Sequence, residues 1–318
     1  MTFFSILFAL LIEQLKPLRA DNPVYGAARS LAARLEASFN AGQAQQGRLA
    51  WVLMIVAFTL PVAILYWIAL QLGLLFVLLL NVAVAYLTLG FRHYSHYFTS
   101  IQLALNGGDE ATARALLSEW TGRDTAGMDL SEVARITVET ALITSHRNVF
   151  GVFFWFLTPL GAVGAVMYRV AEYLSRIWNA PRMPERDEFG RFARQAFYLI
   201  DWIPVRLTAA AFAVVGNFED AVYAWRNFAG RWQDEAAGII LSVGGGAMGI
   251  RLGASQENAS TVPAADADVT EANGAEPEVQ PGEEATGRAL QSTVGLVWRA
   301  LLLWMLLVLL LSIAKWLG

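Results

Sequence analysis

The sequence predicts an all-α, polytopic integral membrane protein with four to five membrane-embedded helical segments, some of them broken or re-entrant. Hydrophobic residues make up 56% of the 318 residues and charged residues only 16%, and the mean hydropathy is +0.44. Such a chain is too apolar for an ordinary soluble domain. It has no cysteine, which excludes disulfides, thiolate catalysis and cysteine-ligated metals.

The N-terminal segments predict a hairpin in the membrane. Residues Phe3–Ile12 form an apolar run that is shorter than the roughly 20 residues needed to cross a bilayer, so it either lies in the interface or enters the membrane partway. We see no basic leader and no small-residue cleavage site of a removable signal peptide. Trp51–Leu70 and Leu72–Phe91 each predict a spanning helix. These two helices are close enough in the sequence to form a hairpin.

The segments that flank this hairpin are expected on one side of the membrane. Residues 16–49 are amphipathic and rich in basic residues, so the positive-inside rule predicts that they and residues 92–148 are cytoplasmic. The expected location is the bacterial inner, cytoplasmic membrane, crossed several times.

The central apolar runs contain prolines. Val149–Tyr168 holds Pro159 near its centre and either spans with a kink or turns back. We favour re-entry or a broken helix, because the next segment is rich in arginine. Its arginines are Arg169, Arg176, Arg182, Arg186, Arg191 and Arg194. Leu199–Gly216 raises the same question, and Pro204 predicts a helix that starts there, with Asp201 just ahead of it.

The C-terminal third changes composition twice. Ala236–Leu252 has too many glycines to predict a helix, and Ala254–Gly287 is acidic and lacks aromatic residues, which predicts disorder. Val294–Ile313 predicts a last spanning helix. The expected division is a membrane domain at 1–253, a disordered acidic linker at 254–293 and a C-terminal transmembrane helix at 294–318.

A charged stretch separates the hairpin from the central runs. It opens with the turn Gly122–Thr125, after which Asp129 and Glu132 have the spacing of a capping box. On the helix that follows, polar side chains at offsets of three, four and seven share one stripe. They are Glu132, Arg135, Glu139 and His146. A solvated helix face and a functional surface both explain this stripe.

A series of short motifs, in one order over residues 1–253, indicates a family. They are Gly108-Asp109, Ala113-Arg114, Gly122-Arg123-Asp124-Thr125, Val138-Glu139-Thr140, Asn148, Gly151, Tyr168-Arg169, Phe189-Gly190, Asp201, Pro204-Val205-Arg206-Leu207 and Met248-Gly249-Ile250-Arg251-Leu252-Gly253. In these motifs the chain resembles the adenosylcobinamide-phosphate synthase family of cobalamin biosynthesis, the CobD/CbiB type. The chain also resembles the related inner-membrane protein AmpE in its opening residues 1–4, in residues 91–97 and in residues 201–207.

The chain departs from the CobD/CbiB pattern at four places, one of which is Glu172-Tyr173-Leu174-Ser175, where the family usually has Asn and Leu-Asp. Arg147 stands where the family has Glu, Phe150 stands where an Asp precedes Gly151, and Ile200 replaces one acid of an expected Asp-Asp pair. These departures leave open whether the chain is an amide-forming ligase or a non-enzymatic, AmpE-like signalling or modulator protein.

The resemblance implies an ATP-driven condensation of adenosylcobyric acid with aminopropanol phosphate, with Mg²⁺ and ATP as cofactors. It implies catalytic roles for Asp124, Glu139 and Asp201, with Asp124 and Asp201 also as metal ligands. The implied substrate-binding residues are Arg123, Thr125, Asn148, Tyr168, Arg169, Arg206 and Arg251. A structural network of ion pairs sealing the helical bundle is the alternative explanation for the charged members of this set.

The expected partners are the lipid bilayer and a corrinoid substrate or, in the AmpE-like case, a membrane or periplasmic protein. The chain has no Walker A motif and no basic-aromatic pattern for nucleic acid. His93 and His96 flank Tyr94 at the end of a predicted spanning helix. Aromatic and histidine side chains are common at the ends of spanning helices, so an interfacial position explains these residues better than a metal site does.

Overall fold

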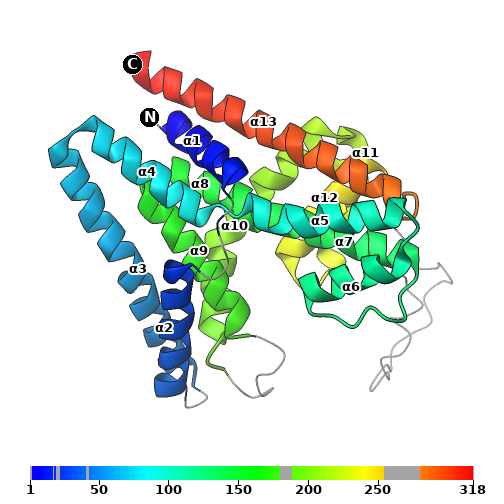
Figure 1. Ribbon diagram of the computed structural model, residues 1–318, viewed down its shortest axis with the longest axis horizontal. Helices are drawn as coiled ribbons and strands as arrows, with labels where there is room; N and C mark the ends of the chain where they lie inside the picture. Colours follow the sequence, from blue (N-terminus) through cyan, green and yellow to red (C-terminus); the bar gives the residue numbers. More distant parts are fainter. Residues whose placement is uncertain are drawn as a thin grey trace.

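The structure is a computed structural model that describes residues 2–16, 18, 22–40, 43–179, 188–253 and 280–317. Within these residues the chain is helical, and its β-structure is a single isolated bridge between Ile250 and Glu283. The predicted all-α fold is therefore confirmed. Figure 1 shows α3 and α4 on one side, α5 to α7 on the other, and α8 to α10 between them.

The N-terminal part contains a helical hairpin, but its second helix, Leu74–Thr88, corrects the prediction: it has 15 residues and is shorter than the helices able to cross a membrane. The helices of this part are α1 (Thr2–Leu15), α2 (Pro23–Phe39), α3 (Ala44–Leu72) and α4 (Leu74–Thr88). Helix α3 begins at Ala44 rather than at Trp51, and Gly73 joins it to α4 with φ +115°, a conformation that favours glycine. Helix α1 packs against α4 and the C-terminal helix.

A group of polar helices follows the hairpin: α5 (Phe91–Asn106), α6 (Glu110–Thr121) and α7 (Leu130–Ser145). Asp129 caps α7 as predicted, because its Oδ1 accepts a hydrogen bond from the Glu132 amide at 2.6 Å. The Glu132 carboxylate pairs with Arg135 at 3.4 Å. The cap and the ion-paired stripe on α7 stabilise its exposed side.

The central apolar run is broken, as predicted. A π-helix, η1 (His146–Phe150), leads into α8 (Gly151–Leu157), and after the break at Pro159 the chain continues in α9 (Gly161–Ile177). Helices α8 and α9 pack against each other. Their approach is close at Gly164, where a Cβ would lie 2.8 Å from the Trp155 carbonyl oxygen.

Helix α10 (Arg191–Val215) corrects the predicted helix start at Pro204, because it runs without interruption through this proline. Pro204 has no N–H to donate to the carbonyl of Ile200, one turn earlier. The indole Nε1–H of Trp155 donates to that carbonyl oxygen instead, at 3.2 Å. A tertiary contact therefore replaces the hydrogen bond that the proline removes, and Asp201 lies inside the helix.

The glycine-rich segment is also a helix, which corrects the second local prediction. After α11 (Phe218–Phe228) and a short 3₁₀ turn, η2 (Ala229–Arg231), comes α12 (Glu235–Met248). Its glycines allow close packing: a Cβ at Gly246 would lie 2.5 Å from the Asp220 carbonyl oxygen. Gly249 ends the helix with φ +68°.

The last helix, α13 (Gly287–Leu317), begins before Val294. Ahead of it, the buried Gln280 donates to the Ser242 carbonyl oxygen at 3.2 Å, and Glu283 pairs with Ile250. Residues 254–279 of the predicted linker lie outside the described residues. The proposed division into membrane domain, linker and terminal helix therefore stays a prediction.

Three helices of the described residues are long and apolar enough to cross a membrane: Ala44–Leu72, Arg191–Val215 and Gly287–Ala314. Shorter apolar helices are Thr2–Leu15, Leu74–Thr88 and Glu235–Met248. Together these helices indicate a membrane protein.

Candidate functional site

A cluster of four polar side chains lies buried where η1, α9 and α10 meet. His146 Nε2 is 2.9 Å from Asp201 Oδ1 and 3.1 Å from Oδ2, and the Tyr168 hydroxyl donates to Asp201 Oδ1 at 2.9 Å. His146 Nδ1 lies 2.9 Å from Thr208 Oγ1. His146, Asp201, Tyr168 and Thr208 are exposed by 2% or less. We call these four residues the Asp201 cluster.

The hydrogen bonds determine how many protons the Asp201 cluster holds. The Thr208 hydroxyl donates to the Pro204 carbonyl oxygen at 3.0 Å, so it accepts from His146, whose Nδ1 therefore carries a proton. One further proton lies between His146 Nε2 and the Asp201 carboxyl group. Whichever of the two holds that proton, the pair carries no net charge, which is the form that burial favours.

Local sequence explains why these groups meet. Asp201 and Thr208 are seven residues apart on α10, so they share one face. The π-helix places His146 opposite that face. Gly151 makes room for the tyrosine, because a Cβ at this position would overlap the Tyr168 hydroxyl.

The same π-helix carries a polar rim on its outer side. Asn148 Oδ1 accepts a hydrogen bond from Arg169 Nη1 at 2.6 Å, and Arg169 also donates to the Arg147 carbonyl oxygen at 3.4 Å. Arg147 reaches the Asp234 carboxylate at 3.4 Å. We call Arg147, Asn148 and Arg169 the η1 rim. Since π-turns inside helices often occur at functional sites, the rim and the Asp201 cluster form the candidate site.

Arg206 lies in a separate surface group. It pairs with Glu235 at 2.6 Å and stacks on Trp202, with its guanidinium carbon 4.0 Å from the ring centre. The Tyr198 hydroxyl donates to Glu235 at the same place. This hydrogen bond, followed by Arg206, holds the pKa of Glu235 below its ordinary value.

The Gly122–Thr125 turn has structural contacts of its own. Asp124 Oδ1 accepts from the Ala126 amide at 3.0 Å, and the Thr125 hydroxyl donates to the Arg114 carbonyl oxygen at 2.8 Å. The Arg123 carbonyl oxygen accepts from Ser118. Among the described residues, no hydrogen bond or ion pair connects this turn to the Asp201 cluster, and Figure 1 shows the α6–α7 connection well apart from the centre of α10.

Glu139 and Arg251 lie near the last glycine motif. Glu139 Oε1 accepts from Arg135 at 2.9 Å and from the Gly253 amide at 2.8 Å. Arg251 donates to the Gly282 carbonyl oxygen at 3.3 Å. The structure thus divides the predicted site residues: Asp201 and Tyr168 meet, Asn148 and Arg169 meet, and the others lie in separate groups.

The Asp201 carboxylate does not fit Mg²⁺ as it is placed. Magnesium requires oxygen ligands in a near-octahedral shell, whereas both oxygens of Asp201 face an imidazole and one also accepts from a phenol. In the described part of the chain, no group of three or more His, Cys, Asp or Glu side chains could hold a metal ion. A metal-binding role for Asp124 and Asp201 stays a prediction.

Sequence reasoning omitted His146 and Thr208 from the site. His146 was noted as part of the polar stripe on α7, but it is buried and turned towards Asp201. A signal was present, because a histidine directly before an apolar run needs a buried partner. Thr208 follows Asp201 by two helical turns and gives the matching signal on α10.

Comparison with known proteins gives one consistent result. The model of the CobD/CbiB protein family matches residues 6–289. The cobalamin biosynthesis protein CobD of Stutzerimonas stutzeri is 31% identical over 314 residues, which cover 96% of this chain and 97% of the relative. The CobD of Chromobacterium violaceum is 34% identical over 209 residues, or 65% of this chain and 64% of that protein. No solved structure matches the chain.

Proposed function

Because the chain belongs to the CobD/CbiB family, we propose that it acts in cobalamin biosynthesis as an adenosylcobinamide-phosphate synthase. The reaction joins the carboxylate of adenosylcobyric acid to the amine of aminopropanol phosphate. An amine cannot displace a carboxylate oxygen until that oxygen has become part of a leaving group, so phosphoryl transfer from ATP belongs to the proposal, with Mg²⁺ accompanying the nucleotide rather than bound by Asp201. We propose the bacterial inner membrane, crossed several times, as its location.

The main support for the proposal is that the π-helix contacts the buried Asp201 cluster on one side and forms the partly exposed η1 rim on the other. Its first residue, His146, contacts the buried Asp201, and the next two residues, Arg147 and Asn148, form the rim with Arg169. The rim side chains are partly exposed, with Arg147 at 27% and Arg169 at 22%. Guanidinium groups at such a place are suited to hold the phosphate and carboxylate groups of the two substrates.

In this proposal the Asp201 cluster positions the rim and does not touch the substrate. The contact to Asp201 fixes the orientation of His146 and with it the π-turn that presents Asn148. Asn148 in turn orients the Arg169 guanidinium through their 2.6 Å hydrogen bond. A rim held in this way loses little conformational entropy when it binds an anion.

The alternative is a non-enzymatic, AmpE-like role at the membrane. One specific observation favours it: the Asp201 cluster is sealed from solvent. A sealed and charge-balanced cluster serves a structural role without any further chemistry. In that case the chain keeps the family scaffold, and its partner is a membrane or periplasmic protein.

Complementation of a synthase-deficient strain that depends on added cobyric acid tests the proposal. We expect the wild-type chain to restore growth and Arg169→Gln to abolish it while the amount of folded protein stays normal. Arg194→Gln is the matched control, because it removes the same charge from an exposed position on α10, whereas Arg176 shares the buried carboxylate of Glu172 with Arg169. We expect this variant to grow like wild type. Failure of well-expressed wild-type chain would contradict the synthase proposal and favour the AmpE-like role.

A further inference from the structure

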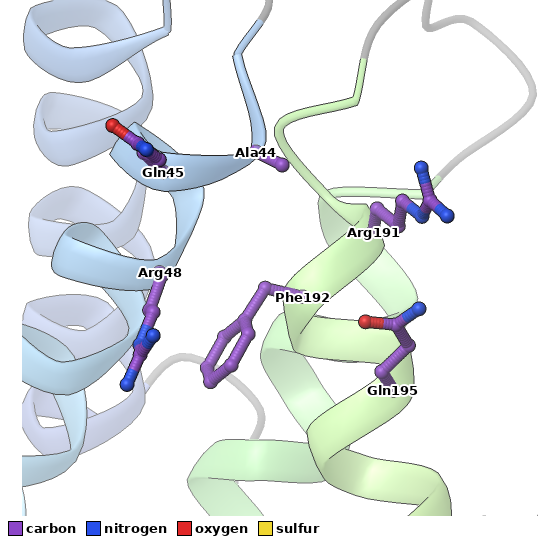
Figure 2. A pocket seen from close by; sticks show the side chains of 6 residues that line it. All are labelled: Ala44, Gln45, Arg48, Arg191, Phe192 and Gln195. Carbon is purple, nitrogen blue, oxygen red and sulfur yellow. The ribbon is translucent and has the colours of Figure 1, made fainter.

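A pocket lies at the N-terminal ends of α3 and α10, and the proposed function does not use it. Its volume is about 280 Å³. It is lined by Ala44, Gln45 and Arg48 from α3 and by Arg191, Phe192 and Gln195 from α10. Figure 2 shows the Phe192 ring pointing from α10 towards Arg48.

The chemistry of the lining favours an anion. Two guanidinium groups and two carboxamides line the pocket, and none of the described residues that line it is acidic. The Arg48 guanidinium lies over the Phe192 ring, 5.7 Å from its centre, which orients its N–H groups. Arg191 contacts Glu188 at 3.1 Å outside the lining, and both are about half exposed. Such an exposed pair is weak and leaves Arg191 able to bind a phosphate.

The two helices are tightly joined at this end. Gly47 on α3 faces the Phe189 carbonyl oxygen so closely that a Cβ would overlap it. Trp51 packs on Phe192 edge to face, with ring centres 5.4 Å apart. Because both helices are long enough to cross a membrane and begin side by side, the pocket lies at one membrane surface.

Deeper in the membrane, the same helix faces become apolar and exposed. Four and eight residues after Arg48 come Val52 and Val56, which are 42% and 47% exposed. Four and eight residues after Gln195 come Leu199 and Ile203, which are 72% and 48% exposed. Residues four apart lie above one another on a helix. The pocket is therefore followed, on each of the two helices, by a row of exposed apolar side chains. This arrangement matches a lipid, with a charged headgroup and two acyl chains.

We propose that this pocket binds a phosphate group, carried by an anionic phospholipid whose acyl chains lie along α3 and α10. Arg48 and Arg191 hold the phosphate oxygens. The carboxamides of Gln45 and Gln195 bind the remainder of the headgroup. Basic pockets between membrane helices bind anionic headgroups in this way. Inorganic phosphate from solution is the other molecule that offers a phosphate group to this pocket.

Native mass spectrometry of the full chain in detergent tests the proposal, with added phosphatidylglycerol or phosphatidylcholine as the probe. We expect the wild type to prefer phosphatidylglycerol and the double variant Arg48→Gln/Arg191→Gln to lose that preference by roughly 25-fold, since each of the two basic residues contributes about fivefold to such attraction. Arg34→Gln/Arg226→Gln is the matched control, because it removes the same charge from exposed positions on α2 and α11. This control should keep the preference.

Thermal unfolding with and without inorganic phosphate distinguishes the two sources. If lipid is the occupant, inorganic phosphate leaves the unfolding temperature of the wild type unchanged. Stabilisation by phosphate that the double variant loses, without any lipid preference, would overturn the lipid assignment in favour of free phosphate. Equal preference for phosphatidylglycerol in the wild type and the Arg48→Gln/Arg191→Gln variant would contradict the proposal that this pocket binds the headgroup.

Discussion

Helices α3 and α10 are both long and apolar enough to span a membrane, yet they are built for different surroundings. In an apolar stretch of 18 residues within α3, only 11% is buried by the rest of the protein, whereas 44% of the corresponding stretch of α10 is buried. From Trp51 to Leu72, α3 has no Asp, Glu, Lys or Arg, whereas α10 contains Asp201 and Arg206. The lipid accepts the apolar surface of α3, while α10 requires protein partners for each polar group.

A polar residue is tolerated in such an apolar helix where a neighbouring helix supplies a hydrogen-bond partner. Asp201 is surrounded by His146 and Tyr168, and the Ile200 carbonyl freed by Pro204 receives the Trp155 indole. All of these partners come from η1, α8 and α9. The broken central run therefore provides the polar contacts that the polar groups of an apolar helix such as α10 require.

The largest expected effect comes from removing the buried carboxyl group on α10. Asp201→Ala leaves His146 without its partner, and breaking a buried pair costs about 3–5 kcal/mol. Leu60→Ala on α3, where the side chain is 52% exposed, should change the stability by less than about 0.5 kcal/mol. Unfolding in detergent by circular dichroism measures both variants. Similar losses would break the proposed contrast between the two helices.

A smaller effect is expected from the contact that supports Pro204. Trp155→Phe keeps the aromatic ring but removes the Nε1–H donor to the Ile200 carbonyl oxygen, which should cost about 1–3 kcal/mol. The double variant Trp155→Phe/Pro204→Ala restores a backbone donor to that carbonyl and should recover part of the loss. If Pro204→Ala lowers the stability equally with and without Trp155, the indole does not have the proposed role.

These contacts also show what the sequence could and could not predict. Apolar runs and the Pro159 break predicted the hairpin and the broken central helix, because both follow from local composition. The continuous α10 and the helical glycine segment were missed. Their helical form depends on distant partners, the Trp155 indole for Pro204 and the Asp220 backbone for Gly246.

The candidate site was predicted in part for a similar reason. Motifs identified Asp201, Tyr168, Asn148 and Arg169, which the structure brings together in two adjoining groups. The motif at Gly122–Thr125 forms contacts within its own turn instead. Sequence order cannot show which motifs meet in space, and the π-turn that aims His146 at Asp201 has no local pattern of its own.

The smallest expected effect concerns Arg206 and Glu235, the exposed counterpart of the Asp201 pair. Glu235 is 42% exposed, so Glu235→Gln should cost less than about 1 kcal/mol at neutral pH. Its folded pKa is lowered, first by Tyr198 and then by Arg206. The contribution is therefore present above the unfolded pKa and is lost as the pH falls through the folded pKa. Unfolding of wild type and Glu235→Gln at neutral and acidic pH should give a small difference that disappears in acid. A loss as large as that of Asp201→Ala would mean that this surface group is as essential to the fold as the buried one.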